Sequence, residues 1–204
     1  MRAVIFAGGE ITDYSYIKDL LRRDDILFAA DSGLEHIRKL GLEADVMIGD
    51  MDSVKSEISG KEVIRLEVMK DETDTEAAAL LAIERGANEL LFLGAMGCRK
   101  DHSIANVLLL KRFSDMNIKA SIADEKNEIY YLDSKITLRG NKDDTVSVIP
   151  LSDLEGITTT GLFYRLDNDV LYMGTSRGVS NVMTDCECTI VVKKGNALVI
   201  KSRD

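Results

Sequence analysis

Two aspartates one residue apart, Asp50 and Asp52, follow an apolar run in the segment "IGDMDS" (residues 48–53). If a strand continues through this segment, its two-residue alternation points both carboxylates to the same face. Carboxylates that close repel each other unless a cation lies beside them, and a divalent metal such as Mg²⁺ takes oxygen ligands of this kind. Gly, Asp and Ser are also common in turns, so a solvated turn without a ligand is the alternative interpretation.

The first 125 or so residues alternate short apolar runs with amphipathic helical patterns. The expected strands lie at residues 3–9, 26–33, 45–53, 62–67, 89–97 and 119–124. The expected helices lie at residues 14–23, 34–41, 73–86 and 103–116. Apolar strands separated by helices indicate βαβ units, so this α/β part of the chain is predicted to form a parallel sheet with helices on both faces.

From about residue 127 the pattern changes to short strands without helices between them. These strands are expected at residues 128–132, 135–140, 145–151, 156–161, 162–166, 169–174, 188–195 and 197–202. Closely spaced β-branched and aromatic segments separated by Gly, Asn and Asp are typical of an antiparallel sandwich or barrel. The chain is therefore predicted to have two domains, residues 1–126 and residues 127–204.

Acidic residues and glycines follow several strands of the predicted parallel sheet. Asp31, Asp50 and Asp52 follow the apolar part of expected strands, and a glycine-containing stretch at residues 94–97 follows that of another. In open parallel sheets, ligands bind in the crevice beyond the carboxyl ends of the strands. The convergence of these residues at one edge of the sheet favours a binding site there over a set of unrelated turns.

Asp71 and Asp74 lie at the start of the expected helix 73–86. Thr73 and Glu76 form a capping-box pattern, and a carboxylate in the first turn complements the helix dipole, so a purely structural role is one interpretation. The same position puts Asp71 and Asp74 near the ligand-binding edge of the sheet, where they could hold a metal or accept a hydroxyl proton.

The stretch "GAMGCRKDHSIANVLLL" (residues 94–110) joins a glycine-containing turn to a helix. The free backbone N–H groups at a helix N-terminus suit an anion, and Arg99 adds positive charge beside them. His102 and Asn106 are four residues apart and share one helical face. The structural alternative is that Asp101 is only an N-cap and that His102 and Asn106 are surface residues.

Two further polar features lie elsewhere in the chain. The segment "GTSRGVSN" (residues 174–181) is too polar and rich in glycine for a buried strand, which favours a hairpin loop. If this loop binds a ligand, Ser176, Ser180 and Asn181 are the expected hydrogen-bonding residues. His36, in the expected helix 34–41, is predicted to lie on the helix surface.

Composition excludes several classes of protein. The net charge is −9, from 26 Lys and Arg against 35 Asp and Glu, which argues against sequence-independent nucleic-acid binding. The chain has no apolar run of about 18 residues, so no membrane span is expected. Three cysteines and two histidines do not suit a structural zinc site, and reduced thiols fit the cytosol. The apolar run at the N-terminus breaks at glycines too early for a secretory leader, so a cytoplasmic protein is predicted.

The ordered motifs resemble the thiamine pyrophosphokinase family over nearly the whole chain. The segments that carry the resemblance are "ADSGLEHIRKLGLEADVMIGDMDS", "KDETDTEAAALLAIERGANELLFLGAMGCRKDHSIANVLLL", "VSVIPLSDLEGITTTGLFYRL" and "GTSRGVSN". The resemblance implies a Rossmann-like nucleotide-binding catalytic domain at residues 1–126 and a thiamine-binding antiparallel β-sandwich at residues 127–204. It also implies a homodimer with active sites between subunits, and transfer of a diphosphoryl group from ATP to the hydroxyl of thiamine, giving thiamine diphosphate and AMP.

Combined with the resemblance, the motifs give a full set of expected site residues. Metal-binding and catalytic roles fall to Asp50, Asp52 and Asp71, which would hold Mg²⁺, and to Asp74, which could take the hydroxyl proton. ATP binding falls to Asp31, Arg99, Asp101, His102 and Asn106, and thiamine binding to Ser176, Ser180 and Asn181. Cys98 is a local departure, because the family usually has a second glycine there.

Two other functions are compatible with the motifs. The first is a related Mg²⁺-dependent diphosphokinase that acts on another primary alcohol, such as a hydroxymethylpterin. The second is a non-catalytic nucleotide-binding sensor on the same scaffold. A sensor would be expected to have lost acidic residues, whereas Asp50, Asp52, Asp71, Asp74 and Asp101 are all present.

Overall fold

The computed structural model describes residues 1–51, 60–67 and 71–203. Within it the chain forms two compact units, an N-terminal unit (Met1–Glu125) and a C-terminal unit (Lys126–Asp204). The division between them falls next to the boundary expected from the change in sequence pattern. None of the helices in the described ranges has the length and hydrophobicity to cross a membrane.

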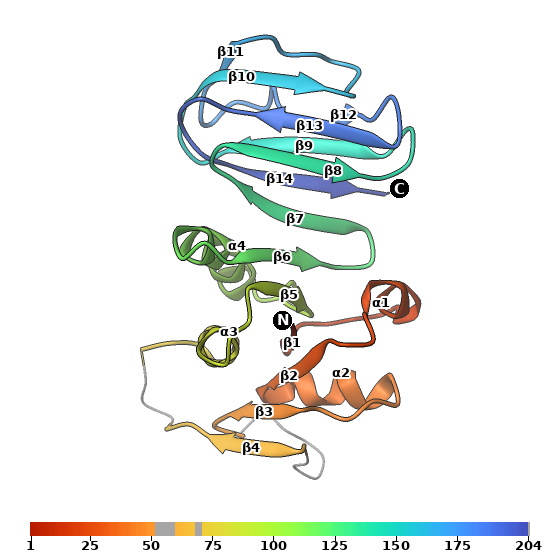
Figure 1. Cartoon of the computed structure of the whole chain (residues 1–204), viewed down its shortest axis with the longest axis vertical. Coiled ribbons are helices and arrows are strands. Elements are labelled where there is room, and N and C mark those ends of the chain that lie inside the picture. The colour runs from red at the N-terminus through yellow and green to blue at the C-terminus, as the bar shows by residue number, and fades with distance from the viewer. Residues whose placement is uncertain (52–59, 68–70, 204) are drawn as a thin grey trace. The chain divides into compact units, whose positions relative to one another are not determined.

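The N-terminal unit is built on a parallel sheet (Figure 1). Its strands are β1 (Arg2–Phe6), β2 (Ile26–Ala30), β3 (Val46–Gly49), β4 (Glu62–Arg65), β5 (Glu89–Leu93) and β6 (Lys119–Ala123). They lie in the order β4-β3-β2-β1-β5-β6, and each neighbouring pair is parallel. The central strands are buried almost throughout, as expected for continuous apolar runs covered on both faces.

Helices cover both faces of this sheet. They are α1 (Ser15–Leu20), the short 3₁₀ helix η1 (Asp31–Gly33), α2 (Leu34–Lys39), α3 (Asp74–Glu84) and α4 (Lys100–Asp115). Figure 1 shows α1 and α2 on one side of the sheet and α3 and α4 on the other. The buried ring of Phe113 on α4 stacks on Phe92 of β5, with ring centroids 5.7 Å apart, which joins that helical layer to the sheet.

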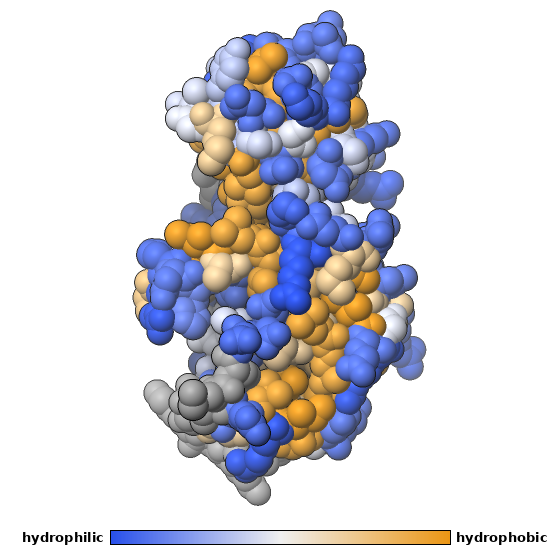
Figure 2. Space-filling model, turned by 90° about the vertical axis from the view of Figure 1, so that its left-hand side faces the viewer, coloured by the Kyte–Doolittle hydropathy of each residue, from blue (hydrophilic) through white to orange (hydrophobic). Residues whose placement is uncertain are grey.

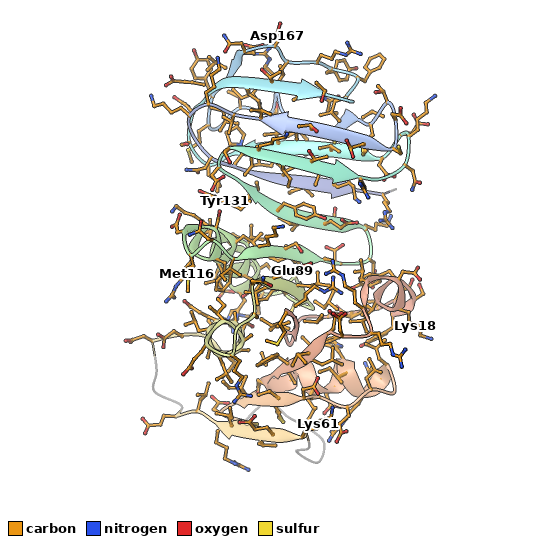
Figure 3. The ribbon with its side chains drawn as sticks, viewed as in Figure 1. Lys18, Lys61, Glu89, Met116, Tyr131 and Asp167 are labelled. Carbon is orange, nitrogen blue, oxygen red and sulfur yellow. The ribbon has the colours of Figure 1, made fainter. Side chains whose placement is uncertain are left out.

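Paired charges occupy the sheet edge at which the strands begin. The Arg2 guanidinium lies 2.6 Å from the Asp25 carboxylate and 3.8 Å from that of Glu89, and Lys61 pairs with Asp45 at 2.7 Å. Figure 3 labels Lys61 and Glu89, which lie at the beginnings of β4 and β5. These charges neutralise one another at the edge where the strands begin.

The C-terminal unit consists of antiparallel strands (Figure 1). They are β7 (Asn127–Leu132), β8 (Lys135–Arg139), β9 (Thr145–Pro150), β10 (Leu154–Thr160), β11 (Asp169–Leu171), β12 (Asn181–Val182), β13 (Glu187–Val191) and β14 (Ala197–Ser202). One layer has the order β12-β9-β14-β7 and the other β11-β10-β13-β8. Val148 and Val199 of the first layer share a buried cluster with Leu138 and Ile190 of the second, so the unit is a β-sandwich.

Two details of this sandwich differ from the sequence prediction. Residues 162–166 do not form the expected strand, and only an isolated bridge joins Leu162 to Met183. Gly161 has a φ of 73° and a backbone so close to the carbonyl oxygen of Glu187 that a Cβ would lie 2.2 Å away, so the chain turns out of β10 there. Conversely, residues 174–181 were predicted as a loop, but their last residue, Asn181, begins the two-residue strand β12.

Candidate active site

The direction of the strand connections reverses between β1 and β5. The chain proceeds from β1 to β2 on one side, whereas β5 leads to β6 on the other side of β1. Such a reversal opens a crevice at the carboxyl ends of the two strands, where ligands of open α/β sheets bind. Here the two loops are joined directly, because the Gly9 N–H donates to the carbonyl oxygen of Gly94 at 2.7 Å.

The loop after β1 can approach the loop after β5 only because residue 9 is glycine. A Cβ at Gly9 would lie 2.3 Å from the carbonyl oxygen of Gly94 and 2.4 Å from that of Met96. Both distances are well inside van der Waals contact, so any side chain would force the loops apart. The result is a pair of closely packed turns that leads directly into α4.

The aspartates that follow β2 and β3 lie at the same edge of the sheet. Asp31 opens η1 with a φ of 48°, and Gly49, the last residue of β3, packs so close that its Cβ would lie 3.1 Å from that of Asp31. The strand ends at Gly49 and Met51 has a φ of 69°, so the expectation of strand alternation through the Asp50 pair is wrong. Asp50 is half-buried, and Asp52 lies outside the described residues.

Two expected site residues stand at the N-terminus of α3. Asp74 is the first helical residue and is half-buried, whereas Asp71 is exposed in the turn before the helix. The predicted cap is present, because the Thr73 hydroxyl accepts a hydrogen bond from the Glu76 N–H at 3.2 Å. The Glu76 carboxylate forms an ion pair with Arg112 of α4. A helix that follows a parallel strand begins at the carboxyl edge, so Asp74 belongs to the same edge as Asp50.

An Arg–Asp pair begins α4. Arg99 is the N-cap residue, and its guanidinium binds the Asp101 carboxylate through Nη2–Oδ2 at 2.6 Å and Nε–Oδ1 at 3.1 Å. This pairing holds the pKa of Asp101 well below its usual range. Asp101 is therefore not the N-cap that the structural alternative assigned to it. The side chain of His102 is exposed in the same turn.

Two side chains of α4 hold the turn between β5 and the helix. The Asn106 amide Nδ2 donates to the carbonyl oxygen of Ala95 at 2.8 Å, and the buried Ser103 hydroxyl accepts from the Gly97 N–H at 3.1 Å. Ser103 was not among the expected site residues, because no motif distinguishes it from other helix serines. Cys98 is exposed and is not among the residues with positive φ, so its side chain fits where the family usually has glycine.

Two carboxylates of this edge have oxygen atoms of the type that a hard cation binds. Asp31 and Asp50 offer oxygen donors at the ends of neighbouring strands, and hard cations such as Mg²⁺ prefer oxygen ligands. Among the residues that the structure describes, no group of three or more His, Cys, Asp or Glu side chains is assembled for a metal. Ligands beyond those described, or oxygens of a bound substrate, would have to complete the coordination.

In the C-terminal unit, residues 174–181 are fixed along β9. The carbonyl oxygen of Gly178 accepts from the Val148 N–H at 2.8 Å, and the Ser180 N–H donates to the buried Ser147 hydroxyl at 3.0 Å. The side chains of Ser176 and Ser180 remain exposed. The loop therefore has a fixed backbone that presents hydroxyl groups to solvent.

Asn181 differs from Ser176 and Ser180, the other two residues expected to bind thiamine, because its side chain is hydrogen-bonded within the protein. Its amide Nδ2 donates to the carbonyl oxygen of Tyr164 at 2.7 Å, and its Oδ1 accepts from the Tyr164 N–H at 2.9 Å. Phe163 and Tyr164 are 67% and 66% exposed, and their rings meet edge to face, with centroids 5.0 Å apart. Neither aromatic residue was an expected site residue, because residues 162–166 have the composition of a strand.

The parallel sheet, the glycine turns at its switch point and the adjoining N-terminus of α4 define the N-terminal unit as an α/β domain of the kind that binds phosphate-containing ligands. Comparison with known families is more specific. Residues 17–122 match the family model of the thiamin pyrophosphokinase catalytic domain, and residues 133–196 match that of the thiamin pyrophosphokinase vitamin B1 binding domain. The chain belongs to the thiamin pyrophosphokinase family, whose enzymes transfer a diphosphoryl group from ATP to thiamine.

Known proteins resemble the chain over its whole length. Thiamine pyrophosphokinase of Bacillus subtilis is 28% identical over 213 residues, which cover 98% of each chain. A crystal structure of thiamine pyrophosphokinase from Bacillus subtilis superposes with a TM-score of 0.89 at 25% identity and covers 100% of both chains. Thiamin pyrophosphokinase from Candida albicans shares the fold, with a TM-score of 0.83 at 14% identity over 99% of this chain and 89% of that one. The predicted fold class is confirmed.

Proposed function

We propose that the triphosphate of ATP lies at the switch point between β1 and β5. The observation that supports this most directly is the hydrogen bond between Gly9 and Gly94, which joins the two turns where an anion can approach backbone groups. Arg99 stands at the adjoining N-terminus of α4 and adds a guanidinium suited to phosphate oxygens. Asn106 and Ser103 keep the turn in shape through their bonds to Ala95 and Gly97.

Asp50, Asp52 and Asp71 are the proposed Mg²⁺ ligands. Bound together with ATP, the ion would neutralise charge on the phosphates, a need common to phosphoryl-transfer enzymes. Support comes from the chemistry of the donor set and from its place, because Asp50 follows β3 beside the end of β2, where Asp31 stands. In this proposal Asp31 lies beside the metal-binding carboxylates and helps to orient the nucleotide.

In the transfer step, the thiamine hydroxyl oxygen bonds to the β-phosphorus of ATP. The bond from that phosphorus to the oxygen bridging the α- and β-phosphates breaks, and AMP leaves with that oxygen. Asp74 is the proposed acceptor of the hydroxyl proton, since its half-buried carboxylate stands at the start of α3 on the same sheet edge. Arg99 offsets the negative charge that develops on the leaving group. Asp101 and His102, in the first turn of α4, would contact the nucleotide.

Thiamine recognition is assigned to the C-terminal unit. The exposed hydroxyls of Ser176 and Ser180 supply hydrogen bonds, and Asn181 acts through the backbone of Tyr164. The exposed rings of Phe163 and Tyr164 offer an apolar surface to the rings of thiamine. The thiazolium ring is a permanent cation, which an aromatic face and a chain of net charge −9 both attract.

The proposal includes a cytoplasmic homodimer with active sites between the subunits. Ile104 and Leu108 are one helical turn apart on α4 and are 61% and 49% exposed. A second copy could cover these two apolar side chains, and Figure 2 views the molecule from the side on which Figure 1 places α3 and α4. The free thiols of Cys98, Cys186 and Cys188 fit a reducing compartment. Light scattering of the wild type and of Leu108→Glu tests the dimer.

Incubation with ATP, Mg²⁺ and thiamine tests the reaction. We expect AMP to form in a one-to-one ratio with thiamine diphosphate and only when thiamine is present. Formation of ADP with thiamine monophosphate would contradict diphosphoryl transfer. A parallel incubation with a hydroxymethylpterin is the control for acceptor identity, and turnover of the pterin without turnover of thiamine would favour the alternative diphosphokinase.

A further inference from the structure

His36 is buried, in contrast to the prediction that it lies on the surface of its helix. Its side chain is only 8% exposed, because α2 turns this residue toward the loop that follows β1. Both ring nitrogens have partners: Nδ1 lies 2.6 Å from the Tyr14 hydroxyl, and Nε2 lies 2.8 Å from the carbonyl oxygen of Gly9. The histidine therefore connects α2 to two points of the loop between β1 and α1.

The partners of His36 determine its tautomer. A carbonyl oxygen can only accept a hydrogen bond, so Nε2 carries the proton and donates to Gly9. In the neutral ring, Nδ1 then accepts from the Tyr14 hydroxyl. Burial lowers the pKa of His36, an effect that nearby Lys39 increases and that Glu35 and the bond to Gly9 oppose. The ring is thus held neutral at physiological pH, with its donor directed at one backbone oxygen.

Gly9 receives this bond at the position where the two turns of the switch point meet. Its N–H donates to Gly94, and its Cα packs so close to Met96 that no side chain fits. A Cβ at Gly94 would lie 3.4 Å from Cδ2 of His36, so the imidazole packs against both turns. The peptide groups on either side of Gly9 are therefore fixed by Gly94 on one side and by His36 on the other.

We infer that His36 is a positioning residue for ATP, which fixes the carbonyl group of Gly9 and thereby the shape of the turn that receives the phosphates. The inference rests on the proposed position of ATP at the switch point. His36 acts through Gly9, and Tyr14 is its accessory partner because the hydroxyl satisfies the second ring nitrogen. Loss of the imidazole donor leaves the carbonyl group of half-buried Gly9 without this partner and frees the turn to rotate.

The test compares steady-state constants of three α2 variants. His36→Leu keeps an apolar side chain but removes the donor, and we expect it to raise KM for Mg·ATP on the order of tenfold while KM for thiamine changes less than about twofold. His36→Gln restores an N–H donor at a similar reach and should recover most of the ATP affinity. Ile37→Val, a substitution at the neighbouring buried position of α2, is the control for general destabilisation and should leave both KM values unchanged.

A second readout is independent of activity. The chain contains only two histidines, so nitrogen NMR of the imidazoles assigns His36 by comparison with His102→Gln. We expect the neutral Nε2–H tautomer and a titration midpoint below that of an ordinary histidine. An Nδ1–H tautomer, or equal changes in KM for ATP and thiamine in His36→Leu, would overturn the inference.

Failure of the inference can be told apart from failure of the proposed ATP site. If Arg99→Ala raises KM for ATP but His36→Leu does not, the ATP site stands and the role of His36 is wrong. If neither variant changes KM for ATP, the proposed position of the phosphates is wrong and the inference falls with it. An ATP-specific increase in both variants, with recovery in His36→Gln, supports both.

Discussion

The side-chain amide of Asn181 binds both backbone groups of Tyr164, donating to its carbonyl oxygen at 2.7 Å and accepting from its N–H at 2.9 Å. The Phe163 N–H donates to the carbonyl oxygen of Val182, as in a pair of strands. At Tyr164, the amide of Asn181 makes the two hydrogen bonds that the backbone of a neighbouring strand would otherwise make. Asn181 therefore determines where the exposed rings of Phe163 and Tyr164 lie. Its contribution to thiamine binding is expected to be indirect.

Asn181→Ala should weaken thiamine binding and leave Mg·ATP binding nearly intact. The substitution removes two internal hydrogen bonds that hold Tyr164, each worth about 0.5–1.5 kcal/mol, so the exposed rings lose their fixed position and a several-fold weaker affinity for thiamine is expected. Calorimetric titration of each ligand into the variant measures both effects. Tyr164→Ala removes the ring that Asn181 positions and should reproduce the thiamine defect. An equal loss of ATP and thiamine affinity in Asn181→Ala would show that residues 174–181 are structural or interfacial.

Asp50→Asn should keep the fold and lose most of the activity. A neutral amide is a poor ligand for a hard cation, and loss of a group that stabilises transition-state charge commonly lowers kcat by on the order of 10²-fold or more. The measurement is kcat as a function of Mg²⁺ concentration, together with the thermal midpoint. Asp45→Asn is the matched control, because this substitution removes the same charge at the opposite edge of the sheet, where Asp45 pairs with Lys61.

Wild-type rates for Asp50→Asn at low Mg²⁺ would return this residue to the solvated-turn interpretation. Asp52→Asn should behave as Asp50→Asn does if both are ligands. A large loss of activity in Asp45→Asn would instead indicate that any loss of negative charge impairs the enzyme, so the metal assignment would lose its support.

The sequence predicted the parallel sheet well because its strands are continuous apolar runs and its helices carry their own periodicity. It also placed Asp31 and Asp50 at the correct edge, since the carboxyl ends of parallel strands must share one edge. It did not predict the end of the strand at Gly49, because methionine rarely has a positive φ and no local pattern marks the φ of 69° at buried Met51.

Contacts between distant segments were beyond the reach of the sequence patterns. His36 bonds to Gly9, which is 27 residues away, and nothing in the helical segment around it indicates that partner. Residues 162–166 have the composition of a strand, yet the amide of Asn181 occupies the backbone groups that a strand would use. Local propensity describes which element a segment favours, whereas these features depend on the partner that the fold supplies.

Thr73→Ala should destabilise the N-terminal unit and lower activity. Thr73 is the N-cap of α3 and accepts from the Glu76 N–H, so its loss leaves that group to water and costs about 1 kcal/mol. Asp74 begins the same helix, and fraying of the first turn would move the proposed proton acceptor and reduce kcat. Urea unfolding and kcat measure the two effects. Thr73→Ser retains the hydroxyl and should retain both stability and rate, so an equal loss in Thr73→Ser would argue against the capping explanation.

Stability between pH 5 and pH 7.5 should depend on His36. Burial lowers its pKa in the folded state, whereas the unfolded chain has a histidine pKa of about 6.5. The unfolded state therefore binds the proton more readily, so the stabilisation is complete above about pH 6.5 and is lost as the pH falls toward the folded-state pKa. Urea unfolding of the wild type and of His36→Gln at intervals across this range measures the effect. We expect the stability of the wild type to fall with decreasing pH more steeply than that of His36→Gln, and parallel curves would show that His36 does not titrate differently in the two states.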